Sequence, residues 1–312
     1  MLFDNTQRAY HLKTDRELYK AYYLFRLISN STLVTVGSWF AQLSLKLRLP
    51  VAPLFKATVF SQFCAGLNKE ESLELVNKLE SYKINSYLHF AAEESKTEEG
   101  MDISLANTLE TLSFSKESSS LPFTVFKATA LGPMSLFKKK GDKIDFTNSE
   151  EETWKRVLNR IDTCCENAKK MGVNLLIDAE ESWFQDAIDE IAESLMEKYN
   201  KEPPFVYTTL QMYRKDRLEY LKNLHENATK KGFKIGVKLV RGAYIEKENS
   251  RALQLGISSP ICESKLMTDL NFNAGLDFIL KNLEDCSLFL GSHNEQSVKR
   301  VIDWMVENKI EK

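Results

Sequence analysis

Short apolar runs alternate with longer amphipathic stretches along most of the chain. From about residue 56 onward we identify seven runs rich in Val, Ile, Leu and Phe, each of a length suited to one strand. They span residues 57–63, 85–90, 123–129, 173–177, 205–212, 234–240 and 286–291. Apolar runs that recur every roughly 30 to 50 residues, with helical segments between them, are typical of β/α units around a parallel sheet.

The segments between the runs carry helix signals. Ser149 followed by Glu152 predicts a capping box at the start of one helix. Apolar residues then recur at helical spacing up to Cys165, and Gly172 stands where that helix should stop. Gly232 has the same position after the next repeat of leucines. We therefore expect helix, strand and helix in turn.

These elements predict an α/β fold, a (β/α)8 TIM-like barrel with an N-terminal helical arm. We assign residues 1–50 to the arm and residues 51–312 to the barrel. Seven runs do not close an eight-stranded barrel, so we expect a chain truncated after the seventh unit, with two open strand edges. The apolar stretch 33–49 is interrupted by Gln42, Lys46 and Arg48, which predicts an amphipathic helix rather than a membrane span.

Composition narrows the class of partner. The 312 residues are 43% hydrophobic and 28% charged, as in an ordinary globular protein, which excludes disordered and fibrous classes. Lys and Arg total 42 against 44 Asp and Glu, so a net charge of −2 gives no broad attraction for nucleic acid. A small molecule is therefore the expected partner.

Cysteines and histidines give no sign of a metal site. The five cysteines contain no C-x-x-C pair, which argues against a zinc ribbon and a disulfide framework. No two histidines have metal-ligand spacing on one helix, so we expect no metal. The polar N-terminus, with Asp4, Asp15 and Glu17, does not suit a signal or transit peptide. We expect a location in the cytoplasm or at the periphery of the inner face of a respiratory membrane.

Polar residues stand at the carboxyl ends of four predicted strands, where β/α barrels carry their reactive groups. They are Lys127, Asp178, Gln211 and Lys238. Any one of these lysines can simply end in solvent at the mouth of its strand. Together the four residues predict a polar site, in which Asp178 balances one of the cations.

Two further segments follow predicted strands. In Arg241–Tyr244, small residues let backbone N–H groups approach an anion, although a glycine after a strand is commonly just a turn. Ser292, His293 and Asn294 offer a hydroxyl, an imidazole and an amide, although Ser292 or Asn294 can equally cap the following helix. His89 lies near a strand end and stays unassigned, and we treat Glu180 and Glu181 as secondary. Adjacent Cys164 and Cys165 suit packing better than redox chemistry.

Four motifs on successive predicted strands resemble the proline dehydrogenase family. They are IDAEESWFQ, YTTLQMYRKD, KLVRGAYIEKE and LGSHN, and the match extends from the segment FKATVFSQFCAG onward. The resemblance implies that FAD lies across the carboxyl face of the barrel. It also implies oxidation of L-proline to Δ1-pyrroline-5-carboxylate, with electrons passed to a quinone at a membrane surface.

The resemblance also assigns roles to individual residues. It implies that Asp178 and Lys238 belong to the catalytic centre and that Lys127 and Tyr244 bind the substrate. The residues implied for FAD are Ala179, Gln211, Arg241, Gly242, Ala243, Ser292, His293 and Asn294. Ser292 stands where the family commonly has threonine, which keeps the hydroxyl. The family's eighth unit supplies a pair of arginines for the substrate carboxylate, so we expect a chain that ends at Lys312 to lack this clamp.

Two alternatives remain open at this stage. A flavin barrel that acts on another cyclic amine, such as hydroxyproline, would carry similar motifs near the flavin. A non-catalytic ligand-binding barrel fits if the natural chain is this short. Flavin absorption by the purified protein would favour the enzyme interpretations, and a colourless protein would favour the binding module.

Overall fold

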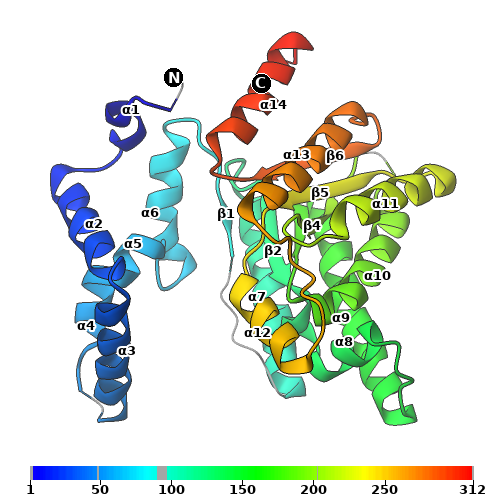
Figure 1. The fold of residues 1–312 in the computed structure, drawn as a ribbon, viewed down its shortest axis with the longest axis horizontal. Helices are drawn as coiled ribbons and strands as arrows, with labels where there is room; N and C mark the ends of the chain where they lie inside the picture. The colour runs from blue at the N-terminus through cyan, green and yellow to red at the C-terminus, as the bar shows by residue number, and fades with distance from the viewer. Residues whose placement is uncertain (1–2, 48, 90–96, 202, 311–312) are drawn as a thin grey trace. The chain divides into compact units, whose positions relative to one another are not determined.

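A computed structural model describes residues 3–47, 49–89, 97–201 and 203–310 (Figure 1). The chain divides into two compact units, Met1–Ile84 and Asn85–Lys312. Across the described ranges, no helix combines the length and apolar character needed to cross a membrane.

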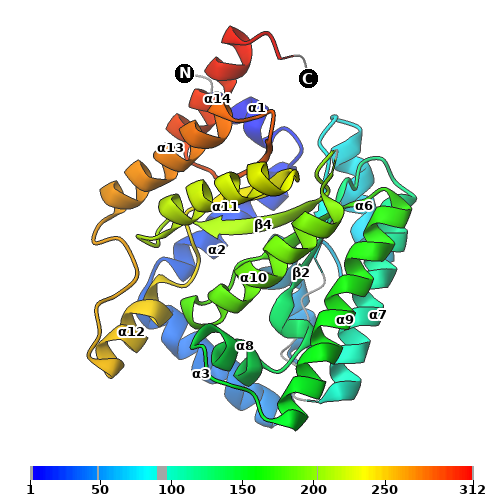
Figure 2. The same ribbon diagram turned by 90° about the vertical axis from the view of Figure 1, so that its right-hand side faces the viewer.

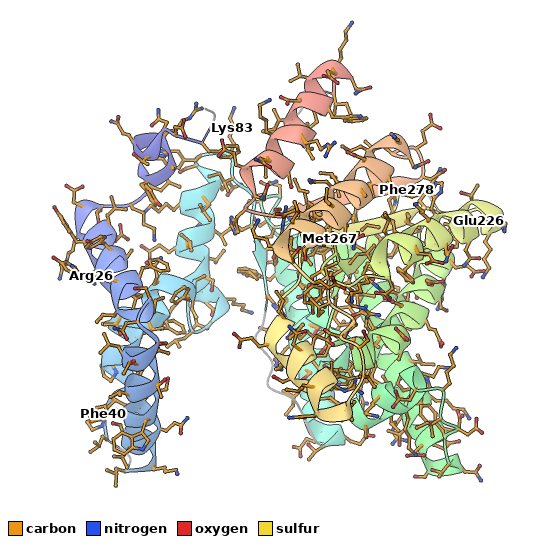
Figure 3. All side chains as sticks on the ribbon, in the orientation of Figure 1. Arg26, Phe40, Lys83, Glu226, Met267 and Phe278 are labelled. Atoms are coloured by element: carbon orange, nitrogen blue, oxygen red, sulfur yellow. The ribbon has the colours of Figure 1, made fainter. Side chains whose placement is uncertain are left out.

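The first unit is helical. Its elements are α1 (Thr6–Tyr10), α2 (Asp15–Ile28), α3 (Ser31–Lys46), α4 (Ala52–Phe55), the π-helix η1 (Lys56–Phe60), α5 (Ser61–Phe63) and α6 (Lys69–Glu80). Thr14 and Glu17 form a capping box that fixes the start of α2. The helix predicted over residues 33–49 is confirmed as α3, which carries exposed apolar side chains such as Phe40 (Figure 3).

The strand predicted at residues 57–63 is wrong, because η1 and α5 occupy this segment. Its backbone is satisfied within the helical turns, as in the bond from the Cys64 N–H to the Phe60 carbonyl at 2.8 Å. A short apolar run does not distinguish a strand from a packed helical segment by periodicity alone. The helical assignment also explains why the first compact unit extends to Ile84 rather than ending near residue 50.

The second unit contains a half-barrel of six parallel strands in the order β1 to β6 (Figure 1). The strands are β1 (Tyr87–Leu88), β2 (Phe123–Lys127), β3 (Asn174–Asp178), β4 (Val206–Gln211), β5 (Ile235–Val240) and β6 (Cys286–Gly291). Each strand pairs with the next one along the chain. The other six predicted strands are therefore confirmed, in an α/β fold of sequential β/α units.

Helices connect the strands and cover their outer side. They are α7 (Glu98–Lys116), the 3-10 helix η2 (Ala128–Leu131), α8 (Met134–Gly141), α9 (Asn148–Met171), α10 (Ser182–Tyr199), α11 (Arg217–Lys231), α12 (Ile245–Leu255), α13 (Lys265–Lys281) and α14 (Glu295–Glu307). Figure 2 shows α7 and α9 side by side, and the tertiary contacts agree. On the same outer side α11 packs against α13, where the ring centroids of His225 and Phe278 lie 5.4 Å apart. Figure 3 labels Phe278 on α13.

Helix ends follow the predicted signals with one shift. The capping box of α9 uses Thr147 and Glu150, two residues before the predicted pair, so Ser149 lies within the first turn. Gly172 and Gly232 end α9 and α11 with φ of 71° and 68°, as predicted, because glycine adopts this left-handed conformation without steric cost.

The main core lies between the sheet and its outer helices. Cys164 and Cys165 are both fully buried in it, and burial raises the pKa of the Cys164 thiol to about 12. Both thiols therefore act as packing groups, as expected. A smaller cluster of Val125, Leu176 and Tyr207 lies on the inner face of the sheet with Phe123 and Phe289 packed against it.

Candidate active site

The pairing register of the strands places the predicted polar residues side by side near the carboxyl ends of the strands. Lys127 pairs with Asp178, and Thr209 pairs with Lys238. In a parallel sheet these positions meet at the carboxyl edge, and alternate side chains point to one face. A cavity of about 590 Å³ opens there. Its lining includes all twelve predicted site residues: Lys127, Asp178, Ala179, Gln211, Lys238, Arg241, Gly242, Ala243, Tyr244, Ser292, His293 and Asn294.

Lys238 and Asp178, which both line the cavity, form an ion pair. The Lys238 Nζ lies 2.7 Å from Asp178 Oδ1, and the two side chains are only 12% and 19% exposed. Thr209 donates a long hydrogen bond of 3.5 Å to the same carboxylate oxygen. The pair keeps a positive charge in a partly dry site, where an unpaired ammonium would be costly.

Lys127 and Tyr244 form a second polar pair. The Lys127 Nζ donates to the Tyr244 hydroxyl at 3.3 Å. Burial opposes ionisation, but Tyr244, Glu180 and Asp178 raise the pKa of Lys127 above its usual value, so the ammonium stays charged. Burial also raises the pKa of Tyr244, which keeps the phenol protonated and able to donate a hydrogen bond. The two groups can therefore present a cation and a neutral donor to one anion.

Gln211 links two neighbouring strand ends. Its side chain is buried, its Nε2 donates to the Glu180 carbonyl at 2.8 Å, and its Oε1 accepts from the Ala243 N–H at 3.0 Å. One Nε2 hydrogen remains for a ligand. Gln211 thus fixes the turn after β5 as well as lining the cavity.

The turn at Arg241–Tyr244 is held by packing and charge. Gly242 has φ of 139°, and a Cβ there would lie 2.5 Å from the ring of Tyr213, so the position requires glycine. Arg241 Nε donates to Asp269 at 2.7 Å and Nη1 donates to Ser292 at 2.8 Å. The guanidinium also lies over the ring of Phe272, 4.2 Å from its centroid. These contacts hold the Arg241 guanidinium beside Ser292, which follows β6.

The segment Ser292–Asn294 caps the following helix and lines the cavity. Asn294 is the N-cap of α14 and accepts from the Ser297 N–H at 3.0 Å. Ser292 accepts from the Asn294 N–H at 3.1 Å as well as from Arg241. All three residues also line the cavity, where His293 is exposed.

The structure adds residues that the sequence reasoning did not single out. Lys265 lines the cavity and binds Asp269 at 2.7 Å. Thr209 lines it from β4 and could have been identified from the alternation with Gln211. Glu180, a secondary candidate in the sequence analysis, is buried, and burial raises the pKa of its carboxyl. Lys265 and Asp269 lie on a helix distant in sequence from the strand ends, so no local pattern marked them.

The donors around the cavity fit a large anionic cofactor. The described lining residues include four cations, Lys127, Lys238, Arg241 and Lys265, against one carboxylate, Asp178. Asp269, just behind this lining, pairs with both Arg241 and Lys265 and reduces the net positive charge. The charge that remains suits a pyrophosphate, and the start of α14 adds backbone N–H groups at the same rim. The volume lies within the range of cofactor pockets.

Comparisons with known proteins identify the family and the fold. A family model described as "Proline dehydrogenase" matches residues 72–312. The "Carbapenem antibiotics biosynthesis protein CarD" of Pectobacterium carotovorum subsp. carotovorum is 30% identical over 253 residues, which cover 81% of this chain and 66% of that protein. "Proline dehydrogenase 1, mitochondrial" of Dictyostelium discoideum is 29% identical over 339 residues, which cover 94% of this chain and 59% of that protein.

A solved structure supports the fold. Proline utilization A (PutA) from Bdellovibrio bacteriovorus, inactivated by N-propargylglycine, superposes with a TM-score of 0.73 at 18% identity. The superposition covers 97% of this chain and 33% of that protein. This chain therefore spans about a third of the PutA protein, and 59% to 66% of the two curated relatives named above.

Proposed function

Because this chain belongs to the proline dehydrogenase family, we propose that it oxidises L-proline to Δ1-pyrroline-5-carboxylate with FAD as its cofactor. The observation that carries the proposal is the convergence of charged side chains from β2, β3 and β5 on one cavity at the carboxyl edge of the sheet. L-proline as substrate, FAD as cofactor and a quinone as electron acceptor are all part of this proposal.

The cofactor residues follow from the lining of the cavity. FAD, when bound, supplies a ring that accepts a hydride. Arg241, Gly242 and Ala243 on one side and Ser292, His293 and Asn294 on the other would hold its phosphates and ribose, and Ala179 and Gln211 would contact its ring. Arg241 suits this role because Asp269 and Ser292 hold its guanidinium in one orientation.

Lys238 and Asp178 are the proposed catalytic residues. Lys238 provides a fixed positive charge at the strand end, which favours negative charge that develops beside it. Asp178 holds the ammonium in place at 2.7 Å. Since both side chains are mostly buried, the charge acts in a region with less water than the surface.

Lys127 and Tyr244 are the proposed substrate-binding residues. The Lys127 ammonium would pair with the carboxylate of proline, and the Tyr244 hydroxyl would donate a second hydrogen bond. This contact orients the ring of the substrate, which is a large part of the catalytic task in hydride transfer. The proline nitrogen must be neutral before hydride leaves, so the rate should rise with pH.

Flavin retention and turnover test the proposal. Purified protein, loaded with FAD and dialysed, should retain flavin absorption and reduce an artificial acceptor or a quinone when L-proline is added. D-proline and hydroxyproline test stereochemistry and the alternative substrate. Colourless protein after loading, or turnover with hydroxyproline but not L-proline, would contradict the assignment.

A further inference from the structure

His89 lies at the carboxyl end of the first strand, on the inner side of the half-barrel. Tyr87 pairs with Phe123, and Leu88 with Thr124. The Tyr87 ring packs edge-on against Phe289 at 6.0 Å and lies 6.0 Å from the Lys238 Nζ, so it faces the interior. Side chains two residues apart on an extended segment share a face. His89 therefore faces the same interior, one step nearer the carboxyl edge.

The charged groups that act on His89 come from three other strands. They are Asp178 on β3, Lys127 on β2 and Lys238 on β5, all of which line the cavity. Partial loss of hydration lowers the pKa of His89, Asp178 opposes this, and the two lysines lower it further. The imidazole is thus neutral near pH 7 and able to accept a proton. The side chain also keeps contact with solvent.

The proposed reaction needs a proton acceptor at this place. A secondary amine such as proline is protonated near pH 7, and its nitrogen must lose one proton before hydride leaves the ring. Lys127 cannot accept this proton because it is itself protonated. Asp178 is less suited to accept it because its carboxylate is paired with Lys238. A general base must be unprotonated at the working pH, and the lowered pKa of His89 keeps its imidazole in that form.

We propose that His89 accepts this proton, an inference that rests on the proposed function. One N–H bond of the substrate ammonium breaks, its electron pair stays on the nitrogen, and the proton moves to an imidazole nitrogen of His89. The freed lone pair on nitrogen would then form the C=N bond as the adjacent ring carbon loses its hydride, for which bound FAD would supply the acceptor. Asp178 stabilises the imidazolium, while Lys127 and Lys238 favour its deprotonation. Because His89 is exposed, the proton passes to water.

The test is the pH dependence of kcat/KM for L-proline in the FAD-loaded full chain. We compare the unmodified protein with His89→Gln and His89→Asn, and we use His11→Gln as the matched control because His11 is an exposed histidine of the first compact unit. Without the base, only the neutral fraction of free proline reacts. The two His89 variants should therefore lose about 10²- to 10⁴-fold near pH 7 and recover by about tenfold per pH unit, whereas the unmodified protein and His11→Gln level off.

Binding of an analogue separates this role from structural damage. A proline analogue with oxygen in place of the ring nitrogen carries no ammonium, so its Kd should be unchanged in the His89 variants. Parallel pH profiles in the unmodified protein and in either folded variant would overturn the role of His89 and leave the proposed function intact. If the unmodified FAD-loaded protein does not oxidise proline at any pH, both proposals fail.

Discussion

Replacing Asp178 by asparagine removes the charge that faces Lys238 and keeps the shape of the side chain. Two unit charges 2.7 Å apart attract by about 6 kcal/mol at an effective dielectric constant of about 20. Desolvation offsets much of this, so breaking a buried pair costs about 3 to 5 kcal/mol and breaking an exposed pair below about 1 kcal/mol. With side chains 12% and 19% exposed, we expect a loss of about 2 to 3 kcal/mol in the free energy of unfolding.

The assay is a double-mutant cycle by chemical unfolding, with Asp178→Asn, Lys238→Met and the double variant. The loss in each single variant corresponds to a fall in Tm of about 4 to 10 °C. The double variant leaves no uncompensated charge, so it should recover part of the loss.

A second ion pair serves as the matched control. Lys230 lies 2.6 Å from Glu226, and the two side chains are 69% and 64% exposed, so the corresponding cycle should give a coupling below about 1 kcal/mol. Additive losses for Asp178 and Lys238, within about 0.5 kcal/mol, would refute the reasoning that the two charges stabilise each other in a dry site.

Four other changes test the site and the structure around it. Gln211→Leu should weaken flavin retention in equilibrium dialysis and lower stability by about 1 to 3 kcal/mol, because the Glu180 carbonyl and the Ala243 N–H lose their partner; unchanged retention would contradict the bridging role. Gly242→Ala should lower Tm more than Gly172→Ala, since only the first adds a clash with Tyr213 to the strain of positive φ. His293→Ala should speed loss of FAD on dialysis with no change in Tm of the flavin-free protein, because His293 is exposed at the cavity rim; full occupancy would show that this residue does not hold the cofactor. Burial opposes ionisation of Asp216, but Arg217 and Arg214 lower its pKa to about 2, so its contribution is present above about pH 4 and is lost as the pH falls toward 2; Asp216→Asn should flatten the unfolding free energy in that window, and an unchanged slope would contradict the pairing.

The strands were predictable where apolar runs lie between clear stop signals. The runs at 173–177 and 234–240 follow the helix stops Gly172 and Gly232, and each contains a strand. The run at 57–63 follows Lys56 without such a helix stop and lies in a helical unit. Its composition suits either conformation, and only the absence of a neighbouring strand among the described residues decides the outcome.

The site was predictable as a set of residues and not as a set of contacts. Parallel strands carry their carboxyl ends to one edge, so polar residues there must meet, and Asp178 was expected to balance a cation. The partner of Arg241 was not predictable, because Asp269 belongs to a helix that approaches only through tertiary packing. The same holds for Gln211, whose partners are backbone groups of two separate segments. Local sequence carries no signal for such contacts.

The most direct measurement of the central claim is a single-turnover reaction without oxygen. FAD-loaded protein is mixed with L-proline, and loss of the visible flavin absorbance is followed in a stopped-flow instrument. We expect proline-dependent bleaching in the unmodified protein, a rate that falls by about 10²-fold in Lys238→Met, and weaker proline binding in Lys127→Met. The absence of bleaching in the unmodified protein, or equal rates in all three proteins, would contradict the claim that this cavity is the site of flavin-dependent proline oxidation.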